Sequence, residues 1–178
     1  MYKKLKLNVG CGKHILRGYI NIDKVKTHKN VKVADIRYLE YTQDSVDEIF
    51  IRHVIEHFYE DEIKDMLIRF RNMLKPNAKG KLIIETVDFK KIMLGWQTGR
   101  MTKELLNHFL FGFYAYEGTR EREPYMMHKY VFDFELLRDF LMDAGFYTVH
   151  NCEVPKPFNY DPKYGDFFTG MRVEATKW

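Results

Sequence analysis

The sequence predicts an α/β domain whose mostly parallel sheet has helices on both faces. Short apolar runs typical of strands alternate with segments of helical periodicity along the chain. The length of 178 residues is typical of one core, so 1–178 is expected to form a single domain. A composition of 46% hydrophobic and 30% charged residues is ordinary for a globular protein and excludes disordered, collagen-like and low-complexity classes.

Strands are expected first at 5–9, 19–22, 31–33 and 48–52. A helix is expected over about 61–74, because its apolar residues recur at three- and four-residue steps: Ile63, Met66, Leu67 and Phe70. The run 81–87 is the clearest strand, and an aromatic stretch without a clean period follows it over 88–130. A second helix is expected from Asp133 to Ala144, where Gly145 stops it. Two closing strands are expected at 146–154 and 167–175.

Polar and glycine residues follow the first four predicted strands. Parallel sheets bind ligands beyond the carboxyl ends of their strands. The residues at those ends are Gly10–Gly12, Asp23, Asp35 and Arg52–His53. Asp23 could accept both hydroxyls of a ribose, and Asp35 could accept an adenine amino group. Taken singly, the glycines are typical of a turn and Asp23 of a cap or turn, so their order along the chain carries the prediction.

In this order and spacing, the chain resembles the class I S-adenosylmethionine-dependent methyltransferases, most closely the small methyltransferase type 11-like proteins. The motifs that carry the resemblance are LNVGCG (7–12), NID (21–23), AD (34–35), VDEIFIRHVIEHF (46–58), RNMLKPNAKGKLIIET (71–86) and HKYVFDFELLRDFLMDAGF (128–146). They extend over nearly the whole chain. The resemblance implies a Rossmann-like, seven-stranded sheet with a C-terminal antiparallel β-hairpin.

The resemblance also implies S-adenosylmethionine as the cofactor and assigns residues to it. Gly10, Cys11 and Gly12 would lie against its methionine end, and Asp23 would hold its ribose. The remaining cofactor contacts would be Asp35 and the backbone of Ile36 at the adenine, and Arg52 and His53 near the sulfonium.

Three departures from the family pattern affect the cofactor site. Asn8 stands where many relatives have an acid, although its amide oxygen can still accept from the cofactor's amine. Only about nine residues separate the first two strands, whereas a parallel crossover usually needs about a dozen or more. The first crossover helix is therefore expected to be shortened or absent. His14 falls near the place of a third glycine.

A competing motif, His-x-x-Glu-His, is formed by His53, Glu56 and His57. Two histidines four apart on a helix can share a zinc ion, with the glutamate as base. A zinc hydrolase would also need a third ligand downstream, and no obvious motif supplies one. The methyltransferase pattern already explains 46–58, so Glu56 and His57 are interpreted as structural and no metal is expected.

The aromatic segment 89–130 is interpreted as a substrate cap inserted after the fifth strand. Its aromatic residues are Phe89, Trp96, Phe109, Phe111, Phe113, Tyr114, Tyr116, Tyr125 and Tyr130. A core or a homodimer face would suit aromatic residues equally well. His128 is the first candidate for a general base toward a hydroxyl acceptor, and His53 is the second. A capping or structural role for His128 stays open.

The formal net charge of +4 averages a segment 1–32 of charge +8 and a remainder of −4. A basic edge can attract nucleic acid or an anionic substrate, or be a solvated lysine face. Two cysteines are too few for a disulfide framework, no apolar run is long enough for a membrane span, and the start does not resemble a signal peptide. A cytoplasmic protein without a membrane span is expected.

The predicted function is methyl transfer from S-adenosylmethionine to oxygen or nitrogen of a small-molecule or sugar acceptor. The main alternative is a non-catalytic S-adenosylmethionine-binding regulator or subunit on the same fold. A nucleic-acid methyltransferase and the zinc hydrolase stay open as further alternatives. A nicotinamide-linked oxidoreductase is disfavoured, because Ile15 replaces the third glycine of its fingerprint.

Overall fold

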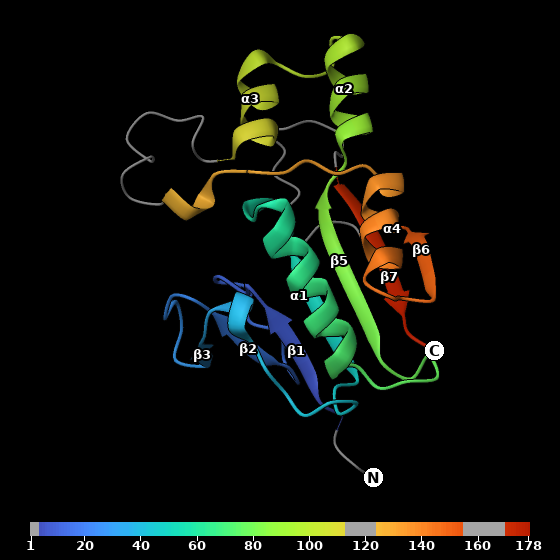
Figure 1. The fold of residues 1–178 in the computed structure, drawn as a ribbon. Coiled ribbons are helices and arrows are strands. Elements are labelled where there is room, and N and C mark those ends of the chain that lie inside the picture. Colours follow the sequence, from blue (N-terminus) through green and yellow to red (C-terminus); the bar gives the residue numbers. More distant parts are fainter. Residues whose placement is uncertain (1–3, 113–123, 155–169) are drawn as a thin grey trace.

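Seven strands form one sheet in the order β3-β2-β1-β4-β5-β7-β6 in the computed structural model, which describes residues 4–112, 124–154 and 170–178 (Figure 1). The strands are β1 (Lys6–Val9), β2 (Ile20–Asp23), β3 (Val31–Val33), β4 (Glu48–Arg52), β5 (Lys81–Val87), β6 (Thr148–Cys152) and β7 (Gly170–Thr176). The first five pair in parallel, and β7 runs antiparallel to both β5 and β6. The predicted mostly parallel sheet with a C-terminal antiparallel pair is confirmed. Residues 155–169, between β6 and β7, lie outside the described part.

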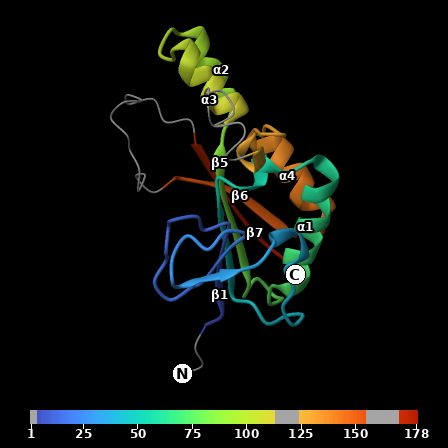
Figure 2. The ribbon, with the colours of Figure 1, turned by 90° about the vertical axis from the view of Figure 1, so that its left-hand side faces the viewer.

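Two long helices flank the sheet on one face, as the views in Figures 1 and 2 agree. Helix α1 (Glu60–Met73) buries the four apolar residues that predicted it, and Tyr59 at its N-terminus donates its N–H to Glu62 at 3.0 Å. Helix α4 (Phe134–Asp143) begins after Asp133, whose carboxylate accepts the N–H of Leu136 at 2.8 Å. Both helices contribute to the main core with the apolar side chains of alternate strand positions.

The opposite face of the sheet is polar over its central strands, because the alternate residues there are charged. Ion pairs link neighbouring strands: Lys6–Glu48 at 3.0 Å, Arg52–Glu85 at 3.3 Å, Arg172–Glu85 at 2.9 Å and Lys81–Glu174 at 2.6 Å. Residues 10–19, which connect β1 and β2, form turns and contain no helix. The predicted reduction of the first crossover is therefore confirmed.

Two helices occupy the aromatic segment in which the sequence shows no period. Helix α2 (Phe89–Gln97) begins after Asp88, and α3 (Lys103–Phe111) begins after Thr102. They form a second small core with Val87 at the end of β5, and Figure 1 shows them beyond that end of the sheet. Of the segment 89–130, residues 113–123 lie outside the described part, with Phe113, Tyr114 and Tyr116.

Short 3-10 helices complete the described chain: η1 (Ile36–Tyr38), η2 (Ile55–His57) and η4 (Pro124–Met126). Within the described residues, no helix has both the length and the apolar character needed to cross a membrane.

Candidate functional site

The ends of β1 and β2 meet through Gly12 and Asp23. The N–H of Gly12 donates to Oδ2 of Asp23 at 2.7 Å, and Oδ1 of Asp23 accepts the N–H of Val25 at 2.9 Å. Gly12 has φ of +51°, and a Cβ placed on it would meet nothing within 4 Å. The structure thus joins two of the predicted site residues and leaves bare, accessible backbone beside the carboxylate.

Gly10 and Cys11 form the start of the same turn. Gly10 has φ of +68°, and a Cβ there would overlap the side chain of Val54, so this position needs glycine for both conformation and space. The N–H of Cys11 donates to the carbonyl of Ile22 at 3.0 Å, which ties the turn to β2. Burial, reinforced by the charge of Asp23, raises the pKa of the Cys11 thiol to about 11. Cys11 is thus a thiol at neutral pH and not a nucleophile.

The side-chain amide of Asn8 stabilises the short connection between β1 and β2. Its amide donates to the carbonyl of His14 at 2.7 Å and to Oδ1 of Asn21 at 2.8 Å. The same oxygen of Asn21 accepts the N–H of Leu16 at 2.9 Å. Both asparagines are buried. The two N–H groups of the Asn8 amide stabilise the segment between β1 and β2, which takes the place of a crossover helix. This structural role of Asn8 was not foreseen from the sequence.

Asp35 lies after β3 and already has a cationic partner. Its carboxylate accepts the backbone N–H of Arg37 at 3.1 Å and pairs with the guanidinium of Arg37 at 2.6 Å. Arg37 also pairs with Glu62 at 3.1 Å. The hydrogen bond from Arg37 holds the pKa of the Asp35 carboxyl below its usual range, although partial burial opposes this. Ile36 next to it is buried in the main core.

Arg52 and His53 lie at the end of β4, near the first turn. Arg52 pairs with Glu85 at 3.3 Å, and the N–H of His53 donates to the carbonyl of Glu85 at 2.8 Å. His53 has φ of +50° and a half-exposed side chain. Burial lowers the pKa of His14, and the nearby charges of Arg52 and His53 lower it further. His14 therefore belongs to the same neighbourhood.

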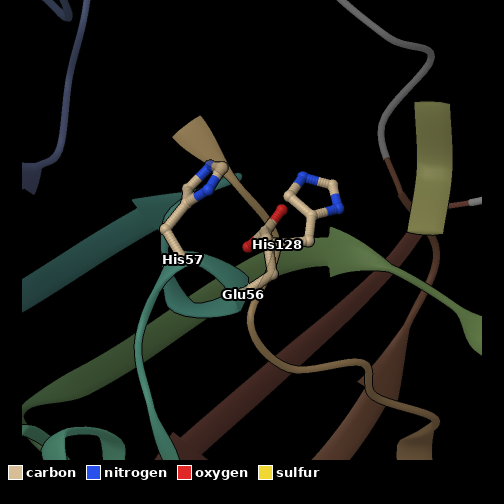
Figure 3. A group of neighbouring side chains, drawn as sticks. All are labelled: Glu56, His57 and His128. Carbon is tan, nitrogen blue, oxygen red and sulfur yellow. The ribbon is translucent and has the colours of Figure 1, made fainter. Parts of the chain in front are cut away.

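A cluster of one glutamate and two histidines adjoins His53. Figure 3 shows the carboxylate of Glu56 directed between the rings of His57 and His128. One ligand atom from each of the three lies within 4.8 Å of the others. The two imidazole rings meet edge to face, with centroids 4.9 Å apart. His53 connects this cluster to the strand ends, because its Nδ1 lies 3.2 Å from Oε1 of Glu56.

The two parts of this cluster come from distant sequence positions. The backbone carbonyl of Glu56 accepts the N–H groups of Lys129 at 2.8 Å and Tyr130 at 3.2 Å. Nδ1 of His57 lies 3.2 Å from the carbonyl of Met127, and Nδ1 of His128 lies 2.9 Å from the carbonyl of Phe109. The motif at 53–57 and His128 are each recognisable in the sequence, but their contact in the fold was not predicted.

The electrostatics of the cluster favour an ionised glutamate beside a neutral histidine. Burial alone would raise the pKa of the Glu56 carboxyl, but the hydrogen bond from His53 and the two nearby imidazoles lower it to about 2. Burial also lowers the pKa of His128, and the negative charge of Glu56 only partly offsets this. At neutral pH the cluster therefore holds a carboxylate and a neutral imidazole able to use its lone pair.

The structure thus brings most of the predicted site residues to one edge of the sheet. Gly10, Cys11, Gly12 and Asp23 form the part at β1 and β2, and Arg52 and His53 form the part at β4. Asp35 lies at the end of β3 in its own ion pair, and His128 is linked to His53 through Glu56.

No protein-family model and no curated protein matches the sequence. Solved structures do match the fold. A SAM-dependent methyltransferase from Archaeoglobus fulgidus is 18% identical with a TM-score of 0.61, over 98% of this chain and 86% of its own. Another from Thermotoga maritima, described as a possible histamine N-methyltransferase, is 16% identical with a TM-score of 0.60, over 100% and 84%.

A third similar structure is a phosphoethanolamine N-methyltransferase from Haemonchus contortus, in complex with phosphomonomethylethanolamine and S-adenosylhomocysteine. It is 15% identical with a TM-score of 0.56, over 99% of this chain and 49% of its own. This chain therefore has the fold of the S-adenosylmethionine-dependent methyltransferases.

Proposed function

We propose that this protein is an S-adenosylmethionine-dependent methyltransferase that modifies oxygen or nitrogen of a small-molecule or sugar acceptor. The observation that carries the proposal is the contact between Gly12 and Asp23 at the ends of β1 and β2. In this fold, that edge of the sheet is where parallel strands present their ligand-binding residues.

The residues at the first turn fit the methionine and ribose parts of this cofactor. Each oxygen of Asp23 accepts one backbone N–H and retains a lone pair, so the carboxylate can still accept the two hydroxyls of a ribose. The open space at Gly12 would let the methionine end of the ligand approach the turn that Gly10, Cys11 and Gly12 form, with Gly12 as the most accessible backbone. Asn8 contributes by holding this turn in place.

Asp35 and the backbone of Ile36 would bind the adenine. Asp35 lies close to the ribose position, because the N–H of Ala34 donates to the carbonyl of Asp23 at 3.0 Å. The ion pair with Arg37 fixes the Asp35 side chain and keeps it ionised. A fixed carboxylate can accept an amino group at low cost in conformational entropy.

Arg52 and His53 would lie beside the reacting group and orient the acceptor. When bound, S-adenosylmethionine supplies an electrophilic methyl group on a positively charged sulfur. The protein then has mainly to hold the acceptor atom in line with that group at attack distance. His53 is suited to this, because its backbone is fixed by Glu85 and its ring by Glu56.

A hydroxyl acceptor would also need to lose a proton, and His128 and His53 are the two proposed general bases. The Nδ1 contact of His128 with a carbonyl leaves Nε2 with its lone pair, and the lowered pKa keeps the ring neutral at pH 7. His53 is more exposed and lies at the end of β4 itself.

The segment 89–130 is proposed to cap the acceptor. Helices α2 and α3 extend beyond the end of β5, on the side where the parallel strands end (Figure 1). Large apolar side chains stay exposed in this segment, including Trp96, Phe111 and Tyr125. They could contact an apolar part of the acceptor or form a homodimer face.

Thermal unfolding and calorimetric titration with a fixed panel of ligands would test the proposal. S-adenosylmethionine and S-adenosylhomocysteine should each raise the unfolding midpoint and bind at one site per chain, whereas NAD should not. Absence of binding by both adenosyl compounds would reject the proposal.

Production of S-adenosylhomocysteine from a panel of hydroxylated and amino acceptors would then identify the reaction. Cofactor binding without turnover on any acceptor would favour the non-catalytic regulator instead. Turnover confined to RNA or DNA would move the substrate class to nucleic acid, in line with the basic segment 1–32.

A further inference from the structure

We propose that Glu56, His57 and His128 form a binding site for one divalent transition-metal ion. The sequence alone favoured a structural role for Glu56 and His57, because no third ligand was apparent downstream. The structure supplies that ligand as His128, which comes from the segment before α4.

The three side chains offer a suitable set of ligand atoms. Two imidazoles and one carboxylate are typical ligands of zinc, manganese, iron and cobalt, whereas calcium and magnesium prefer oxygen ligands alone. Their ligand atoms lie within 4.8 Å of one another. Ligands at about 2.0–2.2 Å from one ion lie roughly 3.4 Å apart in tetrahedral geometry, so the side chains would have to approach one another by up to about 1.4 Å when the ion binds.

Glu56 presents an oxygen that nothing in the described structure satisfies. The residue has 0% exposure, and its Oε1 is the atom that contacts His53. Its Oε2 is buried and has no hydrogen-bond partner among the described residues. A buried carboxylate oxygen without a partner is costly, and a cation between Glu56 and the two rings would remove that cost.

Each histidine ring is oriented by a hydrogen bond from its other nitrogen, as is usual for metal-ligating histidines. In each ring Nδ1 lies at hydrogen-bond distance from a backbone carbonyl, that of Met127 for His57 and that of Phe109 for His128. A carbonyl can only accept, so Nδ1 carries the proton and Nε2 keeps its lone pair. Such outer hydrogen bonds fix the tautomer and the orientation of a ligating imidazole.

The surrounding backbone keeps the site in shape without a metal. The hydrogen bonds from Lys129 and Tyr130 to the carbonyl of Glu56 tie the two ligand segments together. Gly112, with φ of +66°, packs so closely on His128 that a Cβ would lie 2.9 Å from Cδ2 of the ring. Ligands on a preorganised backbone lose less conformational freedom when the ion binds.

A role for the ion in the reaction follows if the proposed function is correct, and this part rests on it. His53 contacts Glu56 directly, so the ion would lie next to the end of β4. Three protein ligands leave coordination positions for an acceptor hydroxyl, whose acidity the ion would increase. The hydroxyl would give its proton to solvent, and the oxygen lone pair would form the bond to the methyl carbon. The carbon–sulfur bond would break with its electron pair remaining on sulfur.

In that case His128 is a ligand rather than a general base, because one nitrogen cannot hold both a metal ion and a proton. The acceptor would be a hydroxyl compound, preferably one with a second oxygen able to occupy another coordination position, as in a sugar diol.

Metal titration of the full-length, tag-free protein would test the site directly. After dialysis against a chelator, the protein should bind one equivalent of Zn²⁺ by calorimetry. One equivalent of Co²⁺ should give visible absorption bands of a nitrogen- and oxygen-ligated site. Glu56→Gln, His57→Gln and His128→Gln should each weaken binding by at least about 100-fold, since loss of outer-shell partners alone costs about 10- to 100-fold.

His150→Gln is the matched control, because His150 is exposed on β6 and outside the cluster. It should bind both ions as the unchanged protein does. The inference is overturned if the unchanged protein binds neither ion, or if all three cluster variants retain full affinity. Circular dichroism at 25 °C checks that each variant is folded. Glu56→Asp keeps the charge should Glu56→Gln fail to fold, and should then retain the Co²⁺ spectrum, at weaker affinity.

Titration of the same preparations with S-adenosylhomocysteine separates this inference from the proposed function. Cofactor binding without metal binding would overturn the metal site and leave the methyltransferase proposal intact. Metal binding without cofactor binding would overturn the methyltransferase proposal and leave the metal site intact. Metal-dependent turnover of an oxygen acceptor, lost in the cluster variants while cofactor affinity is kept, is the expected result.

Discussion

Asp23 and Asp35 look equivalent in the sequence, since each follows a short strand, but their surroundings differ. Among the described residues, the hydrogen bonds to the Asp23 carboxylate come from the backbone N–H groups of Gly12 and Val25. The Asp35 carboxylate pairs with the guanidinium of Arg37. Asp23 is therefore available to a ligand with hydroxyl donors, whereas Asp35 also stabilises the fold.

The ion pair of Asp35 should make the protein less stable in acid. The pKa of this carboxyl is lowered in the folded state, so its stabilising effect is complete above the ordinary carboxyl range. The effect is lost as the pH falls through the lowered value. Asp35→Asn should reduce the free energy of unfolding by about 1 kcal/mol at pH 7 and by much less near pH 2.

Urea unfolding at several pH values would measure this difference. Asp65→Asn is a suitable control, because Asp65 is an exposed residue of α1. A constant difference between Asp35→Asn and the unchanged protein from pH 7 to pH 2 would contradict the assignment.

Gly12 should be needed for cofactor binding more than for folding. Gly12 and Gly18 both have positive φ, and a Cβ on either would meet nothing within 4 Å. Gly12→Ala and Gly18→Ala should therefore destabilise the fold to a similar extent, by about 1–2 kcal/mol. Only Gly12→Ala should also block the approach of S-adenosylhomocysteine, measured by calorimetry. Equal cofactor affinities in the two variants would count against the proposed position of the ligand.

The connection between β1 and β2 shows how side-chain hydrogen bonds replace a helix. Asn8 and Asn21 lie side by side on adjacent strands and bind the carbonyl of His14 and the N–H of Leu16. The segment is too short for a crossover helix, so these amides satisfy backbone groups that a helix would satisfy internally.

Asn8→Ala should therefore destabilise the protein by about 1–3 kcal/mol, because it removes two hydrogen bonds donated by a buried amide and takes a donor from the carbonyl of His14. Asn151→Ala, at an exposed position of β6, should change stability by less than about 0.5 kcal/mol. Urea unfolding of both variants gives the comparison. A loss in Asn8→Ala no greater than in Asn151→Ala would show that the network does not stabilise the turn.

The elements that the sequence predicted well are those with strong local patterns. Helix α1 has its apolar stripe and α4 has Asp133 and Gly145 at its ends, so both were placed to within a residue or two. Helices α2 and α3 were not predicted, because each spans only nine residues and so offers little more than two turns of apolar spacing.

The candidate site was predictable where it follows the chain and unpredictable where it depends on folding. Gly12 and Asp23 lie at consecutive strand ends, so fold class alone brings them together. The contact between Glu56 and His128 depends on the path of the chain through α3 and the segment after it. Local sequence patterns do not predict that path.

The whole sheet has two unlike faces, and this asymmetry affects its stability. One face packs α1 and α4 over an apolar core, while the other carries ion pairs that link β1, β4, β5 and β7. Arg172 is central to these pairs, since it contacts Glu85 at 2.9 Å and Glu174 at 2.8 Å.

Arg172→Met should lower the free energy of unfolding by about 1–3 kcal/mol, because two poorly exposed carboxylates lose their shared partner. Arg138→Met removes an exposed pair with Asp139 and should cost less than about 1 kcal/mol. Urea unfolding compares the two variants. Equal effects would mean that this face behaves as ordinary solvated surface.

Calorimetric titration of Asp23→Asn with S-adenosylmethionine tests the proposed cofactor site most directly. The unchanged protein and the control Asp65→Asn should bind one equivalent with equal affinity. Asp23→Asn should bind about 10- to 100-fold more weakly, because it loses a charged acceptor for the ribose hydroxyls. Failure of the unchanged protein to bind, or equal affinity in Asp23→Asn, would contradict the proposed site.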